Sequence, residues 1–484
     1  MPRCPNILLV MCDQWRAAST GFAGDPTVRT PTLDRLAAHG TVLETAYCSS
    51  PVCSPARASW LTGLYPHGHG QLDNYGPGMS EGSGRRLPAA AVTIGDLLRD
   101  AGYRCGIAGP WHLGGDERPQ HGFGTWDVYR YHADPERTDP YLRHLREHGL
   151  EAAFDHDHRQ RAIKFGSAMA EGFDPTAVAA IPAPHQRTTW TVDRAIDFVR
   201  AHAGGSDPWF HLCSIKDPHP PLVAPAETLA LYDPDAMPLA HTWDDDLTGK
   251  PEFLRGSDHH AAPRFGVRTM RRIAAHYYAL CSHVDRQLGR LLAALEDTGA
   301  APDTIVCFIS DHGESLGEHG LYAKSVMYEQ AVRVPWLLRW PGRILAGARL
   351  RRPVGGVDLV PTLLELAGVP ARTPFHGRSL ASALQSGTEP QAVPVLSEIR
   401  ALERAEDEPP DRLAGTVMIR NGRWKYIRHR FDPCEELYDL HDDPDETSNL
   451  IGTQRDRAAE LRAGIAAVLR AHGAGPYAWA AGDR

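Results

Sequence analysis

The sequence PNILLVMCDQ at residues 5–14 holds an apolar run that ends in Asp13. A second apolar run, TIVCFIS at residues 304–310, is followed at once by Asp311. Short continuous apolar runs are typical of strands that are buried on both faces of a parallel sheet. Ligands bind beyond the carboxyl ends of the strands in such a sheet. We therefore expect Asp13 and Asp311 to meet at one site, although they lie far apart in the sequence.

Amphipathic segments alternate with further apolar runs between these two strands. Apolar residues at helical spacing predict the helices, and Gly40 and Gly102 would end two of them. Helices are expected at 31–39, 92–101, 191–203 and 268–295, and further strands at 103–108 and 209–215. This order predicts an α/β fold with a large, mainly parallel or mixed sheet that is flanked by helices.

The pattern changes in the last part of the chain. Residues 416–427 read TVMIRNGRWKYI, in which a tight Asn-Gly turn joins two strands of a hairpin. A further strand is expected at 436–440 and a helix at 455–472. We therefore expect a catalytic α/β domain at residues 1–385 and a smaller α+β subdomain at residues 386–484.

Composition and charge exclude several classes of protein. The net charge of −9 argues against a general nucleic-acid binder, which needs a basic surface. No apolar run approaches the roughly 20 residues that cross a membrane, and the N-terminus has no secretory cleavage site. The nine cysteines are odd in number and form no CxxC pair, so no disulfide framework is expected. We expect a cytoplasmic enzyme that binds neither nucleic acid nor membrane, with its oligomeric state left open.

Two polar segments, residues 115–190 and 225–265, are expected to be long loops with short helices near the mouth of the active site. Four histidines in these segments could bind a metal, but solvated loop side chains are the preferred interpretation. They are His156, His158, His259 and His260.

The most informative motif is PVCSPARASWLTG at residues 51–63. Ser54 suits the N-cap of a helix and Pro55 its first position, which would place Cys53 just before the positive end of the helix dipole. Arg57 lies one helical turn later, so its guanidinium could point toward Cys53. A buried cysteine beside an arginine that pairs with a surface acid is the alternative interpretation.

The segment CSPARASWLTGLYP at residues 53–66 resembles the signature of the type I sulfatases, which belong to the alkaline-phosphatase superfamily. The resemblance continues along most of the chain. It includes residues 5–8, 13–14, 109–114, 217–221, 310–314, 317–324, 334–335, 340–342, 424–426 and 436–440. It implies an alkaline-phosphatase-like fold and the hydrolysis of a small-molecule sulfate ester.

The resemblance also implies a modified residue and a metal ion. A formylglycine-generating enzyme would oxidise Cys53 to an aldehyde, formylglycine, during maturation. One hydroxyl of the hydrated aldehyde would attack sulfur, and the alcohol would leave as its bond to sulfur breaks. The second hydroxyl would then lose a proton and expel sulfate by restoring the aldehyde. One divalent metal ion would be held by Asp13, Gln14, residue 53, Asp311 and His312. This mainly oxygen donor set suits Ca²⁺, with Mn²⁺ and Mg²⁺ as alternatives.

The catalytic roles that the resemblance implies fall on Arg57, His112, His219 and Lys324, together with Cys53 itself. Arg57 would neutralise charge and His112 would contact the hydrate. His219 and Lys324 would bind sulfate oxygens or protonate the leaving oxygen.

Three positions depart from the common sulfatase pattern. Pro110 stands where the family usually has lysine, Gln14 where many members have aspartate, and His312 where many have asparagine. Some formylglycine-dependent phosphonate monoester hydrolases share the Asp-Gln and Asp-His ligand pairs and have a less cationic site. The alternatives are therefore a phosphonate monoester hydrolase or phosphodiesterase of the same superfamily, and an inactive metal-binding relative. The leaving alcohol stays open.

Overall fold

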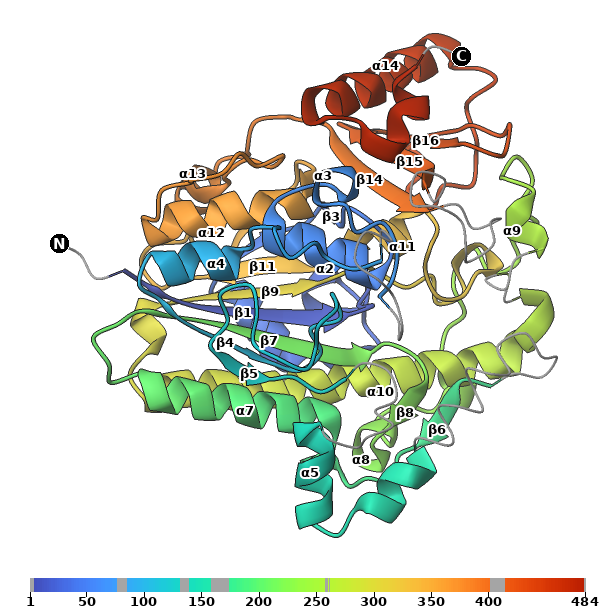
Figure 1. Ribbon diagram of the computed structural model, residues 1–484. Coiled ribbons are helices and arrows are strands. Elements are labelled where there is room, and N and C mark those ends of the chain that lie inside the picture. Colours follow the sequence, from blue (N-terminus) through green and yellow to red (C-terminus); the bar gives the residue numbers. More distant parts are fainter. Residues whose placement is uncertain are drawn as a thin grey trace.

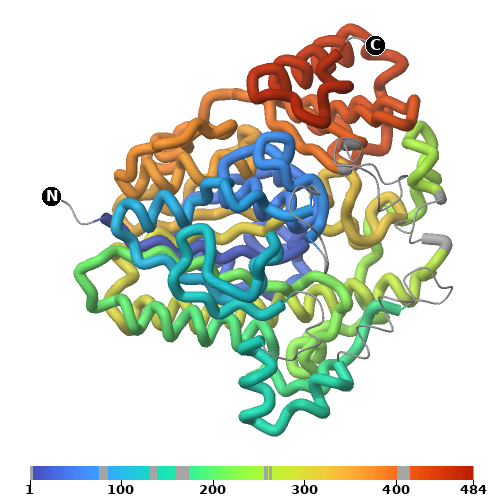
Figure 2. Tube along the Cα trace, in the orientation of Figure 1, coloured from blue at the N-terminus to red at the C-terminus, as the bar shows by residue number. Residues whose placement is uncertain are grey.

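Figure 1 and Figure 2 show the computed structural model, which describes residues 4–75, 85–130, 139–157, 174–256, 260, 262–400 and 414–482. A large central sheet is covered by helices on both faces, and a smaller antiparallel sheet lies beside it near the C-terminus. The predicted α/β fold, with its large mixed sheet and flanking helices, is confirmed.

The main sheet has its strands in the order β12-β2-β11-β9-β1-β7-β4-β5. Its centre is formed by three parallel strands, β9 (Thr304–Ser310), β1 (Asn6–Asp13) and β7 (Trp209–Pro218). The parallel order continues through β4 (Arg104–Ala108) and β5 (Thr125–Asp127). On the other side, β11 (Trp336–Arg339) runs antiparallel to its neighbours β9 and β2 (Thr41–Leu43), and β12 (Ala348–Leu350) forms the edge.

Both faces of β1 are buried, which explains its continuous apolar sequence. Ile7, Leu9 and Met11 pack in one hydrophobic cluster, whereas the alternate residues Leu8 and Val10 pack in another. The first cluster includes residues of α2 (Cys53–Thr62), α4 (Ile94–Asp100) and α12 (Leu359–Ala367). The second includes residues of α1 (Pro31–Ala38), α7 (Arg187–His202) and α10 (Ala262–Asp297), and Figure 1 shows α7 and α10 together below the sheet.

The helix predictions differ from the structure mainly at the ends. The helix predicted at 191–203 begins earlier, at Arg187, and the helix predicted at 268–295 extends to Asp297. The start of α10 is interrupted at Gly266, whose φ of 65° lies outside the helical region.

The shorter elements are β3 (Ala46–Tyr47), α3 (Pro66–His69), α5 (Pro140–Glu147), β6 (Thr176–Val178), β8 (Leu222–Ala224), α8 (Ala226–Leu229), α9 (Phe253–Gly256), α11 (Glu329–Val332), β10 (Arg333–Val334), β13 (Val354–Gly355) and α13 (Ala381–Ser386).

The C-terminal part forms an antiparallel sheet in the order β14-β15-β16-β17. Its strands are β14 (Val395–Arg400), β15 (Ala414–Asn421), β16 (Trp424–His429) and β17 (Glu436–Asp439), and α14 (Arg455–His472) packs on them. The predicted hairpin is confirmed, because Asn421 pairs with Trp424 at the turn between β15 and β16. The domain boundary at residue 385 stays a prediction; α13 ends next to it, at Ser386.

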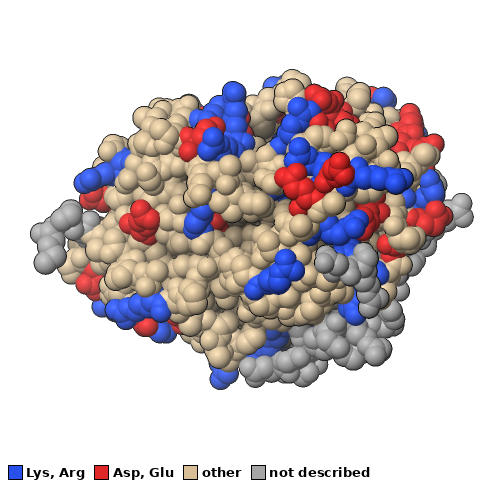
Figure 3. Space-filling model, turned by 90° about the horizontal axis from the view of Figure 1, so that it is seen from above, with Lys and Arg blue, Asp and Glu red and all other residues tan. Residues whose placement is uncertain are grey.

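Acidic and basic side chains are interspersed on the face that Figure 3 shows. None of the helices in the described residues is both long enough and apolar enough to cross a membrane. The nine cysteines all carry free thiols, and all but Cys4 and Cys434 are buried.

Candidate active site

The carboxyl ends of β1 and β9 lie next to each other, as the two acidic strand ends predict (Figure 1). The backbone NH of Asp311 donates to the carbonyl of Cys12 at 2.9 Å, so the first residue after β9 is bonded to β1. The backbone NH of Gln14 in turn donates to Asp311 Oδ1 at 3.0 Å. Gln14 has a φ of 67°, a left-handed conformation that turns the chain sharply after β1. Asp13 and Asp311 therefore share one buried site.

Cys53 is the first residue of α2, and Val52 is the N-cap. The predicted helix start, with Ser54 as N-cap and Pro55 in the first position, is therefore wrong. Ser54 is used in tertiary contacts instead: its hydroxyl donates to the carbonyl of His112 at 2.7 Å and accepts from the NH of Tyr75 at 3.0 Å. These bonds replace the local capping bond that Ser54 would otherwise make.

Arg57 is 2% exposed and holds the two carboxylates together. Its Nε donates to Asp311 Oδ2 at 2.9 Å, and its Nη2 donates to Asp13 Oδ2 at 3.2 Å. Its Nη1 donates to Ser214 Oγ at 2.8 Å and to the carbonyl of Pro110 at 3.4 Å. A buried guanidinium that bridges two carboxylates both neutralises and orients them.

The Cys53 thiol lies where these groups converge. Its Sγ is 3.6 Å from Asp13 Oδ1, 3.2 Å from His312 Nε2 and 3.3 Å from Lys324 Nζ. Burial and the neighbouring Asp13 raise the pKa of the Cys53 thiol to about 12. The thiol is therefore protonated at neutral pH, and a protonated thiol is a weak nucleophile.

The donor atoms at this point could hold a metal ion. One ligand atom each from Asp13, Cys53, Asp311 and His312 lies within 4.8 Å of the others, and all four residues are buried. The Nδ1 atom of His312 is 2.9 Å from the carbonyl of Gly313, so Nδ1 carries the proton and Nε2 is left as the ligand atom. Burial and the charge of Lys324 lower the pKa of His312 to about 3, so its imidazole is neutral.

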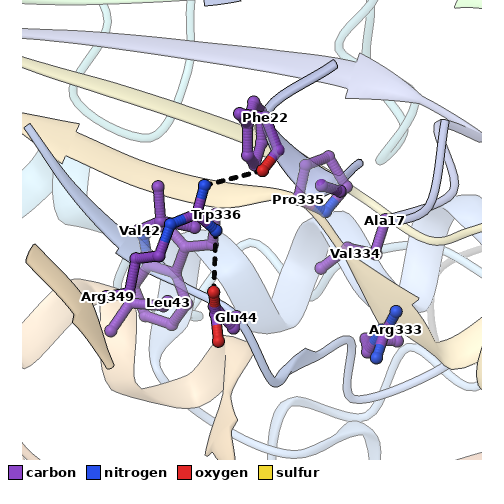
Figure 4. Close-up of a pocket in the computed structure, with 11 residues that line it drawn as sticks. Ala17, Phe22, Val42, Leu43, Glu44, Arg333, Val334, Pro335, Trp336 and Arg349 are labelled. Carbon is purple, nitrogen blue, oxygen red and sulfur yellow. Dashed lines mark hydrogen bonds and ion pairs between the residues drawn. The ribbon is translucent and has the colours of Figure 1, made fainter. Parts of the chain in front are cut away.

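A separate pocket of about 240 Å³ lies against β2 and β11 (Figure 4). Val42 and Trp336 line it, and Arg349 spans it by donating to Glu44 Oε1 at 2.7 Å and to the carbonyl of Phe22 at 2.7 Å. Its described lining contains neither cysteine nor histidine. Asp13, Cys53, Asp311 and His312 lie at the strand ends, and none of them lines this pocket.

A family model described as sulfatase matches residues 5–369. The chain belongs to the sulfatase family. This confirms the family predicted from the Cys53 motif and, with it, a sulfuric ester hydrolase. A second model, described as the C-terminal part of N-sulphoglucosamine sulphohydrolase, matches residues 317–471.

Curated relatives match along nearly the whole chain. An arylsulfatase of Clostridium perfringens is 29% identical over 95% of this chain and 93% of its own length. A choline-sulfatase of Rhizobium meliloti is 31% identical over 93% of this chain and 83% of its own length. Among solved structures, a phosphonate monoester hydrolase from Silicibacter pomeroyi has a TM-score of 0.78 and 26% identity, covering 97% of this chain and 96% of its own. A protein solved with D-glucosamine-2-N,6-O-disulfate, at 21% identity, shows the same fold with a TM-score of 0.75 over 98% of both chains.

Of the remaining predicted residues of this sulfatase, Lys324 meets Cys53 at the same point. Lys324 Nζ donates to Gln14 Oε1 at 2.5 Å as well as contacting Cys53. His219 is buried directly after β7, and burial together with the charges of Lys324 and Lys216 lowers its pKa well below the usual range. His112 is buried, with a φ of 59°.

Of the four loop histidines that the sequence singled out, the structure describes His156 and His260. His156 Nδ1 is 3.3 Å from Asp157 Oδ1, and His260 Nδ1 is 3.1 Å from the carbonyl of Arg255. His158 and His259 lie outside the described residues.

Two residues of the site escaped the sequence analysis. Ser214 in β7 accepts from Arg57 and donates to the carbonyl of Pro110 at 2.7 Å. Glu314 is fully buried and accepts from the amide Nε2 of Gln14, so the amide oxygen of Gln14 faces Lys324. Residues 310–314 (SDHGE) include Glu314, but only the fold shows that Glu314 orients Gln14.

Proposed function

We propose that this sulfatase hydrolyses an organic sulfate monoester with residue 53 as the nucleophile. The observation that carries the proposal is the position of Cys53, whose Sγ lies within 3.6 Å of Asp13, His312 and Lys324 at the start of α2. An anionic ester needs both a nucleophile and nearby positive charge, because a nucleophile must approach a centre surrounded by negative oxygens. Lys324 supplies positive charge beside residue 53, which we propose as the nucleophile after its modification.

The donor set fits a divalent metal ion. Asp13, Asp311 and the amide oxygen of Gln14 are hard oxygen donors, and His312 adds a nitrogen. A metal ion held there would lower the pKa of a hydroxyl on residue 53 and offset negative charge. We propose Ca²⁺ first, with Mn²⁺ or Mg²⁺ as alternatives. We further propose that a formylglycine-generating enzyme converts Cys53 to formylglycine, whose hydrate supplies the attacking hydroxyl.

The surrounding side chains have separable tasks in this proposal. Arg57 fixes both carboxylates, so their oxygens face the nucleophile. Lys324, whose Nζ is 3.3 Å from Cys53 Sγ, binds an oxygen of the sulfate group. His219 binds a sulfate oxygen or protonates the leaving oxygen, and His112 contacts the hydrate on residue 53.

An intact mass of the peptide that contains Cys53 tests the modification. Conversion of the thiol to the aldehyde lowers the mass by about 18 Da, and hydration restores that difference. An unmodified thiol in active enzyme would contradict the nucleophile proposed here. An unmodified thiol in inactive protein would favour the metal-binding relative without catalysis.

A phosphonate monoester hydrolase is the second candidate. Pro110 contributes only a carbonyl, which accepts from Arg57 and Ser214, where a lysine would add charge. The similarity to the phosphonate monoester hydrolase from Silicibacter pomeroyi points the same way. Turnover of an aryl sulfate and an aryl phosphonate monoester by the same preparation separates the two. We expect the higher kcat/KM for the sulfate; a much higher value for the phosphonate would reverse the assignment.

The free thiols support a reducing location, and we propose the cytoplasm. Fractionation of the host cell, with detection of the chain by immunoblot, tests this. Recovery of the chain outside the cytoplasmic fraction would contradict it.

A further inference from the structure

Three histidines outside the main sheet lie close together in the structure. His144 is in α5 (Pro140–Glu147), and His148 is the C-cap of that helix. His185 is the last residue of a short 3₁₀ turn, η2 (Ala183–His185), directly before α7. Figure 1 shows α5 below the end of α7. None of the three belongs to the group of Asp13, Cys53, Asp311 and His312 at the ends of β1 and β9, which is called the strand-end site below.

The ring nitrogens are close enough to share one ion. His144 Nε2 is 3.1 Å from His185 Nδ1, and one nitrogen from each of the three rings lies within 4.8 Å of the others. A tetrahedral zinc site with bonds of roughly 2.0–2.1 Å separates its ligand nitrogens by about 3.3 Å. Small side-chain rotations would therefore bring all three nitrogens to ligand distance.

The proton position of His148 also fits ligation, and an ion would replace the proton shared between His144 Nε2 and His185 Nδ1. His148 Nδ1 donates to the carbonyl of His144 at 2.8 Å, so Nε2 carries the lone pair. A ligating histidine commonly donates its other ring NH to a backbone carbonyl in this way. The hydroxyl of Tyr141 donates to the carbonyl of His185 at 3.0 Å and so fastens η2 to α5. Burial and the two neighbouring histidines lower the pKa of His144, which keeps its ring neutral.

The site is reachable from solvent. His148 is exposed, and His144 and His185 are half-buried. A bound ion would therefore keep one position for water, beside three imidazole ligands. Neutral imidazoles suit late first-row metals such as Zn²⁺, Cu²⁺ and Ni²⁺, unlike the oxygen-rich set around Asp13.

We propose that His144, His148 and His185 bind one divalent late transition-metal ion, Zn²⁺ or a chemically similar ion, and thereby link α5 to η2. His144 and His148 are four residues apart and share one face of α5, which is the spacing of a two-histidine helical chelate. His185 comes from 37 residues further along the chain and completes the site.

The test compares metal binding by the untagged full-length chain with binding by three variants, His144→Gln, His148→Gln and His185→Gln. Zn²⁺ affinity is measured by competition with a fluorescent chelator, and the ligand field by the visible absorption of the Co²⁺ form. His39→Gln is the matched control, because His39 is also an exposed helix C-cap whose Nδ1 is 2.8 Å from the carbonyl four residues earlier. The strand-end site is common to all five proteins, so differences between them report the histidine cluster.

We expect each cluster variant to weaken Zn²⁺ binding by about tenfold or more. Loss of a residue that only hydrogen-bonds a metal ligand already lowers metal affinity roughly 10–100-fold. His39→Gln should bind as the wild type does, and the wild type should take up one more Co²⁺ than His148→Gln. Wild-type affinity in all three variants would overturn the proposal. A loss confined to His144→Gln and His148→Gln would also overturn it, because the helix pair alone would then bind the ion. His185→Cys keeps a ligand at this position and should retain Zn²⁺ binding. Retained binding there would show that a loss in His185→Gln comes from the missing ligand and not from misfolding.

Discussion

Replacement of Lys425 by methionine is expected to destabilise the fold strongly. Lys425 lies in β16 and is fully buried, with its Nζ 3.2 Å from Glu329 Oε1 and 2.7 Å from Glu446 Oε1. Methionine has a similar shape but leaves both carboxylates buried without this cation. Removal of one partner from a buried ion pair costs about 3–5 kcal/mol of the free energy of unfolding. We expect a loss in that range for Lys425→Met.

The loss should depend on pH. Burial raises the pKa of Glu446 although the charge of Lys425 opposes this shift. Without Lys425 the folded-state pKa of Glu446 rises further above its unfolded value. Such a carboxyl adds stability below its unfolded pKa and loses it as the pH rises through the folded pKa. Lys425→Met should therefore be destabilised less at about pH 5 than at about pH 8.

Urea denaturation followed by tryptophan fluorescence measures the first unfolding transition of wild type and variant at both pH values. Arg104→Gln is the control, because the Arg104–Asp207 pair has a similar 2.9 Å separation but is largely exposed. An exposed pair is worth less than about 1 kcal/mol. Lys425→Met/Glu446→Gln should recover part of the loss. If Lys425→Met were as stable as Arg104→Gln at about pH 8, the reasoning about this buried pair would be refuted.

Three further predictions concern the active site. Cys53→Ala and Asp311→Ala should each abolish hydrolysis of an aryl sulfate while far-UV circular dichroism stays that of the wild type; full activity in either variant would contradict its role. Lys324→Met removes a cation 3.3 Å from Cys53 Sγ and should lower kcat by about 100- to 1000-fold, as loss of one oxyanion donor does. A tenfold effect or less in steady-state assays would place Lys324 outside the sulfate-binding group. Dialysis against a chelator should remove activity, which Ca²⁺ should restore better than Mg²⁺; activity that survives complete chelation would argue against a metal at Asp13 and Asp311.

The central strands could be predicted because burial on both faces requires a continuous run of apolar residues. The apolar runs of β1 and β9 predicted both strands, and parallel order then brought Asp13 and Asp311 together. The start of α2 could not be predicted in this way. Ser54 has the local preference of an N-cap, but its hydroxyl bonds to His112 and Tyr75, which lie elsewhere in the chain. Tertiary contacts therefore outweighed the local preference.

The histidine cluster shows a similar limit. The spacing of His144 and His148 is visible in the sequence, but the third member, His185, is brought in only by the path of the chain before α7. Of the loop histidines for which solvated side chains were the preferred interpretation, His156 lies beside Asp157. Ser214 could not be predicted for a similar reason, because it contacts Arg57, which is 157 positions away in the sequence. Local pattern predicts elements well, whereas long-range partners need the fold.

The C-terminal antiparallel sheet supports the segment that carries Lys324. Lys324 lies five residues before Glu329, which Lys425 of β16 holds in place. Between them, the hydroxyl of Tyr328 donates to Glu436 Oε2 of β17 at 2.7 Å. Two strands of the small sheet thus anchor the segment that delivers Lys324 to Cys53. Loosening this anchor should misplace Lys324 without touching any group at the nucleophile, so Lys425→Met should lower kcat/KM even at temperatures where the variant stays folded.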